Sequence, residues 1–237
     1  MREKEIWGEF LSRPNRFSIW VRVNGKEELA HLPNPGRLLE VLSPGRPILL
    51  RPAHSERKTK FTAVGAKLGS FLVSLDSTLP NRAFPHILAE GWIPELLGAE
   101  ILQVEPRLGE GRADFLLSLG SRRIWMELKS VTLVRDGLAL FPDAPTTRGA
   151  RHMRELQKVV QEGDEALVLF VVQRPDAERF GPNFEVDPRF SQAFCEALRA
   201  GARTQALVCA FDGEELHPQK LLGPESLVLP EACPASF

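Results

Sequence analysis

Apolar and polar positions alternate in the first third of the chain, which is the pattern of β-strands that bury one face. Every second residue from Phe17 to Val23 is apolar, and Asn24-Gly25 then favours a type I′ hairpin turn into a returning strand at 27–32. The loop Pro33-Asn34-Pro35-Gly36 is followed by a short helical turn at 37–42. Further short strands are expected at 47–51, 59–64 and 70–75. Five short strands predict a small antiparallel barrel of the oligonucleotide-binding (OB) type.

The periodicity changes at Leu79-Pro80-Asn81, so we predict an OB-like domain at 1–79 and a second domain at 80–237. The second domain contains three helical patterns, at 82–91, at 147–161 with Thr147 as N-cap, and at 188–200 after Asp187-Pro188. Its strand patterns lie at 101–105, 113–119, 123–128, 131–134, 166–172 and 205–211, and the tail beyond Pro218 is expected to be irregular. This order predicts a mixed α/β domain with a mixed central sheet.

Three charged residues on two neighbouring strand patterns carry the strongest chemical signal. Glu127 and Lys129 share one face of their strand because side chains alternate, while Met126 and Leu128 face the core. If the two strands pair through the intervening turn, Asp114 lies opposite Glu127 or Lys129. Two carboxylates and a lysine can hold a divalent cation and polarise a water molecule, which suits phosphodiester hydrolysis. An ordinary salt bridge across the hairpin is the alternative.

The net charge of −1 conceals an asymmetry between the two parts of the chain. Residues 1–84 carry 14 Lys and Arg against 8 Asp and Glu, a balance of +6, whereas the remaining residues carry 16 against 23, a balance of −7. A basic part beside an acidic part is compatible with polyanion binding by the first and metal chemistry in the second. The chain has neither a P-loop nor a dinucleotide-binding fingerprint, which argues against nucleotide hydrolysis and dinucleotide use.

The cysteines and the first residues bear on the compartment. Cys195, Cys209 and Cys233 are widely spaced in apolar surroundings, so we expect reduced core thiols rather than a disulfide or a zinc site. The first seven residues mix both charges and lack the apolar stretch of a signal peptide. The apolar run at 166–172 is too short to cross a membrane. We therefore predict a cytoplasmic protein with no membrane partner.

The order of elements, with an acid on the second strand and Glu-x-Lys on the third, resembles the PD-(D/E)xK nuclease core. Five longer sequence motifs resemble the sugar fermentation stimulation protein family. They are His31-Leu-Pro-Asn-Pro-Gly-Arg37, Gly111-Arg-Ala-Asp-Phe-Leu-Leu117, Glu127-Leu-Lys-Ser-Val-Thr-Leu133, Phe141-Pro-Asp-Ala-Pro-Thr-Thr-Arg-Gly149 and Val172-Gln-Arg174. The resemblance covers roughly residues 13–211. It implies an N-terminal OB-like domain, a C-terminal nuclease-like domain and DNA binding, with a regulatory role in sugar (maltose) metabolism.

The resemblance to the nuclease core also implies roles for individual residues. Two acids and one backbone carbonyl would ligate Mg2+ or Mn2+, and the lysine would orient or deprotonate the attacking water. Glu90 matches an accessory acid, and Gln173 would position water or phosphate. The implied catalytic residues are Asp114, Glu127, Lys129, Glu90 and Gln173, and the implied metal ligands are Asp114, Glu127 and the Leu128 carbonyl. One departure is Ala113, because a proline often precedes the first acid in that core.

A set of cations with an aromatic residue among them is predicted to bind DNA, single- or double-stranded and with weak sequence preference. Arg148 and His152 lie one helical turn apart and would hold a phosphate near the metal, unless they only stabilise a helix start. The alternative for the barrel residues is a solvated face. The predicted set is Arg16, Trp20, Arg22, Arg37, Arg57, Lys58, Lys60, Arg148 and His152.

Functions from different classes stay open at this point. One is a metal-dependent nuclease, and another is a DNA-binding regulator of sugar metabolism whose nuclease fold no longer cuts. A third is a structural or protein-interaction module. The intact set of Asp114, Glu127 and Lys129 favours the first without establishing it.

Overall fold

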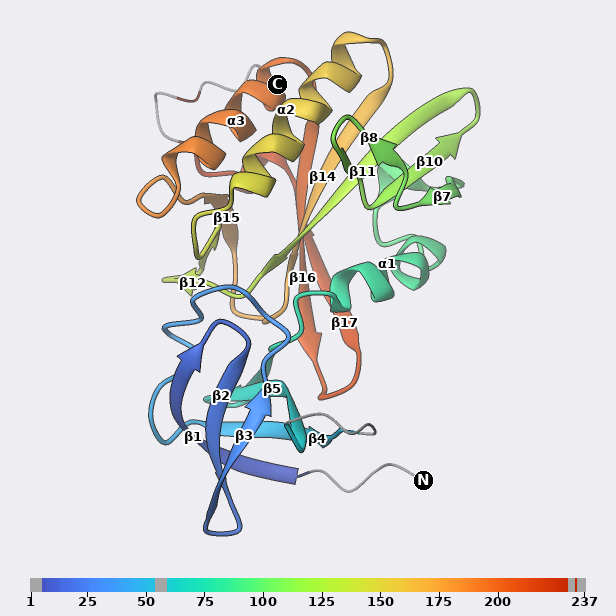
Figure 1. Ribbon diagram of the computed structural model, residues 1–237. Coiled ribbons are helices and arrows are strands. Elements are labelled where there is room, and N and C mark those ends of the chain that lie inside the picture. The colour runs from blue at the N-terminus through green and yellow to red at the C-terminus, as the bar shows by residue number, and fades with distance from the viewer. Residues whose placement is uncertain (1–5, 54–58, 230–232, 234–237) are drawn as a thin grey trace.

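The computed structural model describes residues 6–53, 59–229 and 233, which form a small β-barrel and a larger layered domain (Figure 1). The barrel part contains β1 (Ile6–Asn15), β2 (Ser18–Val23), β3 (Lys26–His31), β4 (Pro47–Pro52), β5 (Phe61–Leu68) and β6 (Phe71–Ser74). The larger part contains the helices α1 (Leu79–Ala89), α2 (Thr147–Gln161) and α3 (Pro188–Arg199), and the short 3-10 helices η1 (Pro94–Leu96) and η2 (Pro224–Ser226). Its strands are β7 (Glu100–Val104), β8 (Arg107–Leu108), β9 (Gly111–Arg112), β10 (Phe115–Leu119), β11 (Arg122–Val131), β12 (Val134–Arg135), β13 (Leu138–Phe141), β14 (Glu165–Val172), β15 (Arg179–Pro182), β16 (Arg203–Phe211) and β17 (Leu216–Leu222).

Five strands close the barrel in the order β3-β2-β1-β4-β5, because β3 also pairs in parallel with β5. The residues that alternate along β2, Ile19, Val21 and Val23, fill its interior. The predicted OB-like barrel is therefore present, although β1 was not predicted. Its inward positions are Gly8 and Phe10, so only one large apolar side chain marks its buried face and the alternation is weak.

The larger domain has the predicted mixed sheet, in the order β16-β14-β11-β10-β7. β14 is parallel to β11 and β16, whereas β10 is antiparallel to β11. α2 and α3 cover one face, where Met153 and Phe194 join the core cluster of Val168. α1 covers the other face, where Phe84 joins that of Met126 (Figure 1). Each strand of the sheet centre is therefore buried on both faces, which explains the continuous apolar run of β14.

Several short strands were not predicted. β8 and β9 have two residues each, which is too short to show a periodicity. The strand predicted at 131–134 is not one strand, because β11 ends at Val131 and β12 begins at Val134. β13 and β15 pair with each other in parallel outside the main sheet. β17 pairs antiparallel with β16, so the expected irregular tail beyond Pro218 is wrong up to Leu222. The register shifts between Val208 and Cys209, opposite Pro218, because proline cannot donate to the ladder.

The helix starts follow capping chemistry. Asp187 caps α3 as predicted, accepting a hydrogen bond from Phe190 N at 3.0 Å. α2 is capped by Thr146 rather than by the predicted Thr147, because the Thr146 hydroxyl accepts from Gly149 N at 3.0 Å. In the described part of the chain, no helix is long and apolar enough to cross a membrane.

The barrel is joined to the central sheet by backbone pairing. β6 pairs with β16 through Leu72 and Phe211, so barrel and domain belong to one 12-stranded sheet. The ring of Phe211 also lies against Gly65 of the barrel, where a Cβ would be 3.0 Å from Cε1. These contacts fix the end of the barrel that faces the larger domain.

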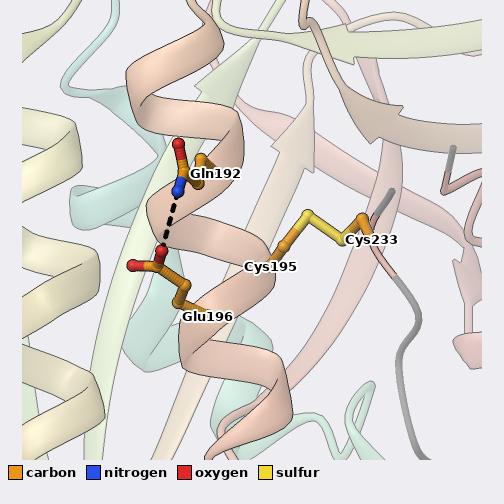
Figure 2. Close-up of a disulfide and its surroundings, with 4 residues drawn as sticks. All are labelled: Gln192, Cys195, Glu196 and Cys233. Carbon is orange, nitrogen blue, oxygen red and sulfur yellow. Dashed lines mark hydrogen bonds between the residues drawn. A yellow bond between two sulfur atoms is a disulfide. The ribbon is translucent and has the colours of Figure 1, made fainter. Parts of the chain in front are cut away.

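A disulfide between Cys195 and Cys233 ties the C-terminal segment to α3 (Figure 2). The expectation of reduced thiols is wrong for this pair, whereas Cys209 is free and buried as expected. Sequence gave no signal for the bond, because three cysteines allow any of three pairings and none has a motif spacing. The cytoplasmic location inferred from the first residues stays a prediction.

Removing this disulfide is expected to lower the free energy of unfolding by about 2–4 kcal/mol, because the bond restricts the unfolded chain. The cross-linked residues are 38 positions apart. Urea unfolding of Cys233→Ser beside the wild type measures the loss. Dithiothreitol should bring the wild type to the midpoint of the variant and leave the variant unchanged, and a wild type indifferent to the reductant contradicts the bond.

Candidate functional site

The hairpin of β10 and β11 brings two acids together. Phe115 and Met126 are the first pair of this hairpin, and Asp114 directly precedes Phe115 in the chain. Asp114 N donates to the Met126 carbonyl at 3.1 Å, which holds Asp114 against β11. The predicted hairpin is therefore present, and Asp114 lies at its open end, close enough to Glu127 for the two carboxylates to repel each other.

The alternation of β11 sends its charged side chains toward α2. Met126 and Leu128 join the apolar cluster under α1, whereas Val131 joins the cluster under α2 and α3. Glu127 and Lys129 share the second direction, and both are buried, at 3% and 9% exposure. The predicted shared face is therefore observed, but it is an interior face, where a surface salt bridge is not an adequate description.

The Glu127 carboxylate is held on one oxygen only. Its Oε1 accepts from Lys129 Nζ at 2.6 Å and lies 2.5 Å from His152 Nδ1. Arg148 Nε donates to His152 Nε2 at 3.4 Å, so the remaining ring proton is on Nδ1 and points to Glu127. Glu127 Oε2 is buried and has no hydrogen-bond partner among the described residues.

Asp114 is the more accessible acid, and both of its oxygens are occupied. Oδ1 accepts from Asn81 Nδ2 and Oδ2 accepts from Leu128 N, each at 2.7 Å. Asn81 lies in the first turn of α1, so this helix orients the acid from the opposite side of the sheet to α2. Sequence reasoning missed Asn81, because nothing local links it to a strand more than thirty residues away.

The two acids have opposite electrostatic environments. Burial raises the pKa of Asp114, and the nearby Glu127 carboxylate raises it further, against the Leu128 amide and Lys129. Burial also acts to raise the pKa of Glu127, but Lys129 and His152 together outweigh it and hold that pKa below its ordinary value. The environment therefore favours the charged form of Glu127, whereas it disfavours the charged form of Asp114.

The β8–β9 hairpin directly precedes Asp114 and packs against α2, the helix that carries His152. Glu155 of α2 accepts a hydrogen bond from Glu110 N at 3.2 Å. A Cβ on Gly111 would lie 3.5 Å from His152 Nε2. The hairpin therefore covers the outer side of the His152 ring, and Glu155 is a supporting residue that the sequence did not indicate.

Two predicted catalytic residues lie elsewhere. The Glu90 carboxylate contacts His86 at 3.2 Å and Trp92 Nε1 at 3.1 Å, at the end of α1 opposite to Asn81. Nine residues of helix correspond to roughly 13 Å, so Glu90 is too far along α1 to join Asp114. Gln173 shares the α1 side of the sheet and donates to Ser130 Oγ at 2.7 Å and Asp76 O at 3.2 Å. Neither prediction is supported by the packing, because each residue faces away from Lys129.

His152 also differs from its predicted role. It is 2% exposed and bonded to Glu127, so a free phosphate cannot replace that partner without moving the acid. Arg148 is exposed on the first turn of α2, as a phosphate contact would require. The spacing of four residues predicted that Arg148 and His152 lie close together. It did not predict that His152 contacts Glu127.

The predicted DNA-binding cations of the barrel fall into two groups. Arg22 is paired with Glu9 at 3.1 Å, and Lys60 is paired with Glu28 at 2.8 Å. Arg16 and Arg37 are exposed, and neither has an ion pair with another described residue. Trp20 is 38% exposed on β2, while Arg57 and Lys58 lie outside the described residues.

The oxygen atoms of Asp114 and Glu127 could supply some of the ligands of a hard cation, but not all of them. Among the described residues, no three His, Cys, Asp or Glu side chains converge as in an all-protein cage. The carboxylates of Asp114 and Glu127 do lie close enough to repel each other, and Glu127 Oε2 is a buried acceptor without a donor among the described residues. Mg2+ commonly binds to one or two carboxylates and takes its other ligands from water and phosphate. The residues present are compatible with that type of site.

The fold and this site define a class, an OB-like barrel joined to an α/β domain whose central sheet carries a buried acid and lysine. Residues 11–75 match the SfsA N-terminal OB domain, and residues 78–215 match the sugar fermentation stimulation protein RE domain. The chain belongs to the sugar fermentation stimulation protein family.

Individual relatives cover nearly the whole chain. A sugar fermentation stimulation protein homolog of Natranaerobius thermophilus is 46% identical over 217 residues, 90% of each protein. One from Desulfitobacterium hafniense strain Y51 is 43% identical over 203 residues, 85% of this chain and 88% of that protein. The structure of Pyrococcus furiosus SfsA in complex with Ca2+ is 32% identical, with a TM-score of 0.86 over 97% of this chain and 98% of that one.

Proposed function

We propose that this protein is a divalent-metal-dependent nuclease that hydrolyses phosphodiester bonds in DNA. The observation that carries the proposal is the Glu127 carboxylate, which has one oxygen held by Lys129 and His152 and the other buried with no hydrogen-bond partner in the described part of the chain. A buried acceptor of this kind is costly unless something binds it. Asp114, which lies nearby and is partly exposed, would give a shared ligand a route to solvent.

Asp114 and Glu127 would hold the ion, Mg2+ or Mn2+, together with the Leu128 carbonyl. Leu128 N–H points to Asp114 Oδ2, and the N–H and C=O of one strand residue point to the same side, so the carbonyl faces the same space. The similar Pyrococcus furiosus protein was solved with Ca2+, another hard cation that prefers oxygen ligands. Such an ion, when bound, lowers the pKa of a coordinated water and offsets phosphate charge.

His152, Lys129 and Arg148 would position the reacting groups and neutralise phosphate charge. His152 Nδ1–H and Lys129 fix the rotation of Glu127, so that its free oxygen keeps one direction. The Lys129 ammonium would orient or deprotonate the attacking water and balance charge on the phosphoryl oxygens. Arg148 extends from the same helix turn toward solvent and would contact a phosphate of the bound DNA.

A DNA-binding regulator of sugar (maltose) metabolism that does not cut is the second candidate. The names of the relatives refer to the stimulation of sugar fermentation. Lys129 and Glu127 are also in direct contact, as they would be in a purely structural ion pair. The two candidates differ in whether Asp114 and Glu127 bind metal and whether DNA is broken.

Asp114→Asn is expected to abolish metal binding and DNA cleavage while stabilising the metal-free protein at pH 7 by about 0.5–2 kcal/mol, as removal of functional strain commonly does. The pKa of Asp114 is raised in the fold, so its ionisation disfavours folding. The destabilisation is absent below the unfolded pKa of about 3.9 and develops as the pH rises through the folded pKa. The advantage of the variant should therefore shrink at low pH.

Three measurements test this proposal on the full chain. Calorimetric titration with Mn2+ and Ca2+ reports metal binding, urea unfolding in EDTA reports stability, and incubation with single- and double-stranded DNA plus Mg2+ or Mn2+ reports cleavage. Undiminished Mn2+ binding by Asp114→Asn contradicts the assigned ligand. Wild-type protein that binds DNA but cleaves neither DNA nor RNA with either metal supports the regulator instead.

A further inference from the structure

Arg13 joins two loops at the end of the barrel that faces the larger domain. Its guanidinium donates to the carbonyls of Gly36 at 2.6 Å, Arg37 at 2.8 Å and Asn34 at 3.1 Å. It also donates to the Arg16 carbonyl at 2.8 Å, in the turn between β1 and β2. One side chain therefore fixes the backbone of the 15–17 turn against that of the 34–37 loop.

The larger domain supports the same loop from the other side. Asp143, between β13 and α2, accepts a hydrogen bond from Leu38 N at 3.2 Å, and its carboxylate occupies the space that a Cβ on Gly36 would need. Leu38 is fully buried with a φ of +54°, a conformation that bulky residues rarely adopt. Such backbone persists only where the surroundings over-determine it, and it is concentrated at functional sites. Both domains therefore hold the backbone of this loop.

The outward side chains of these two loops combine positive charge with apolar surface. Phe17 is 51% exposed and Leu39 is 73% exposed, the latter the most exposed large hydrophobic residue in the described chain. Arg16 and Arg37 are exposed beside them and have no ion pair with another described residue. We define Arg16, Phe17, Arg37 and Leu39 as the junction patch.

Other barrel cations do not offer the same combination. Arg22 and Lys60 are neutralised by Glu9 and Glu28, respectively. Two exposed apolar side chains and two arginines that have no ion pair with a described residue have the composition of a surface for unpaired nucleotides, in which arginines contact phosphates and apolar side chains contact base faces. A duplex hides its base faces in the stack, so it cannot use Phe17 and Leu39 in this way.

We infer that the junction patch is a binding site for single-stranded nucleic acid, and that it directs the strand toward α2. Asp143 lies in the connection that leads into α2, where Arg148 and His152 are carried, so the patch and the Glu127 site are linked through one segment. The reason for binding the strand, its delivery to a nuclease site, rests on the proposed function. The binding itself needs no metal.

Two paired substitutions test the patch by fluorescence anisotropy with a labelled oligodeoxythymidine in EDTA. Arg16→Ala/Arg37→Ala should weaken binding about tenfold or more and make the slope of log K against log salt shallower by about 1.4, since each lost phosphate contact contributes about 0.7. Phe17→Ala/Leu39→Ala should weaken binding about tenfold with the slope unchanged, because stacking is not ionic. Arg22→Ala/Lys60→Ala is the matched control and should change binding less than twofold.

All six side chains are at the surface or in exposed ion pairs, so thermal unfolding should match the wild type and loss of fold is readily detected. Binding that is unchanged in both patch variants, or lost equally in the control, overturns the inference. Equal loss on duplex and single strand in Phe17→Ala/Leu39→Ala overturns the assignment to unpaired bases. Because no metal is present, this result is independent of the Asp114→Asn outcome, which tests the nuclease alone.

Discussion

Lys129→Met is expected to lower the free energy of unfolding by about 3–5 kcal/mol at pH 8, the usual cost of breaking a buried ion pair from one side. The Glu127 carboxylate would stay buried with His152 as its single hydrogen-bond donor. Cleavage should be lost as well, since no ammonium remains to act on water or phosphate. An exposed pair would lose less than about 1 kcal/mol, so a loss of that size contradicts the buried site.

The pH dependence of this loss has a definite sign. In the wild type the pKa of Glu127 is lowered despite burial, so its contribution to stability is present above the unfolded pKa and disappears as the pH falls through the folded pKa. Without Lys129, burial raises that pKa instead, and the variant is least stable at high pH. Urea unfolding at pH 5 and pH 8 should therefore show a smaller difference between variant and wild type at pH 5.

A second substitution separates stability from catalysis. Glu127→Gln in the Lys129→Met background removes the unpaired charge and should recover most of the lost stability, because neutral replacement of both partners is well tolerated. It should recover no cleavage. Glu127→Ala alone should also abolish cleavage of single- and double-stranded DNA with Mg2+ or Mn2+. Cleavage by either Glu127 variant shows that the active site lies elsewhere.

Gly36→Ala is expected to lower the free energy of unfolding by about 3–5 kcal/mol, from overpacking and from a displaced hydrogen bond. A Cβ at position 36 would overlap the Asp143 carboxylate, which Leu38 N and other backbone amides hold. The buried amide of Leu38 would lose its acceptor as the carboxylate moved. Binding of single-stranded DNA should weaken in parallel, because the junction patch depends on this loop.

A double-mutant cycle with Asp143→Ala identifies the cause. Asp143→Ala alone should cost about 1–3 kcal/mol, because it leaves the Leu38 amide unpaired. The double variant should be more stable than the sum of the two single losses implies, by about 1 kcal/mol or more, since the overlap no longer exists. Additive losses would show that the strain at Gly36 arises from another neighbour.

The sequence predicted well whatever depends on neighbours along the chain. The alternation in β11 correctly placed Glu127 and Lys129 on one face, and the short turn after β10 correctly predicted the hairpin that brings Asp114 near Glu127. The range of α2 followed from its apolar stripe, although its cap was assigned one residue late. Hairpin register and helix faces are local properties, set by periodicity and turn length.

Contacts between distant segments were beyond the same reasoning. His152 reaches Glu127 across 25 residues, and Asn81 reaches Asp114 across 33. Glu90 was predicted because it matches an accessory acid of the nuclease core, but it lies at the C-terminal end of α1, away from Asn81. Which end of a helix meets a sheet depends on how both elements pack, and residue type carries no information on that.

The chain by itself determined the barrel, the mixed sheet, and the placement of Glu127 and Lys129 on one face of a strand, because strand periodicity and turns encode them locally. Only the tertiary structure decided that, among the described residues, one oxygen of Glu127 has partners and the other has none, and that Arg22 has an ion pair whereas Arg16 and Arg37 have none. It also decided that Cys195 bonds to Cys233. Each of these depends on burial and on partners from other elements. Such contacts form only when the core packs, and the packed core determines which charges are desolvated and which remain free to bind.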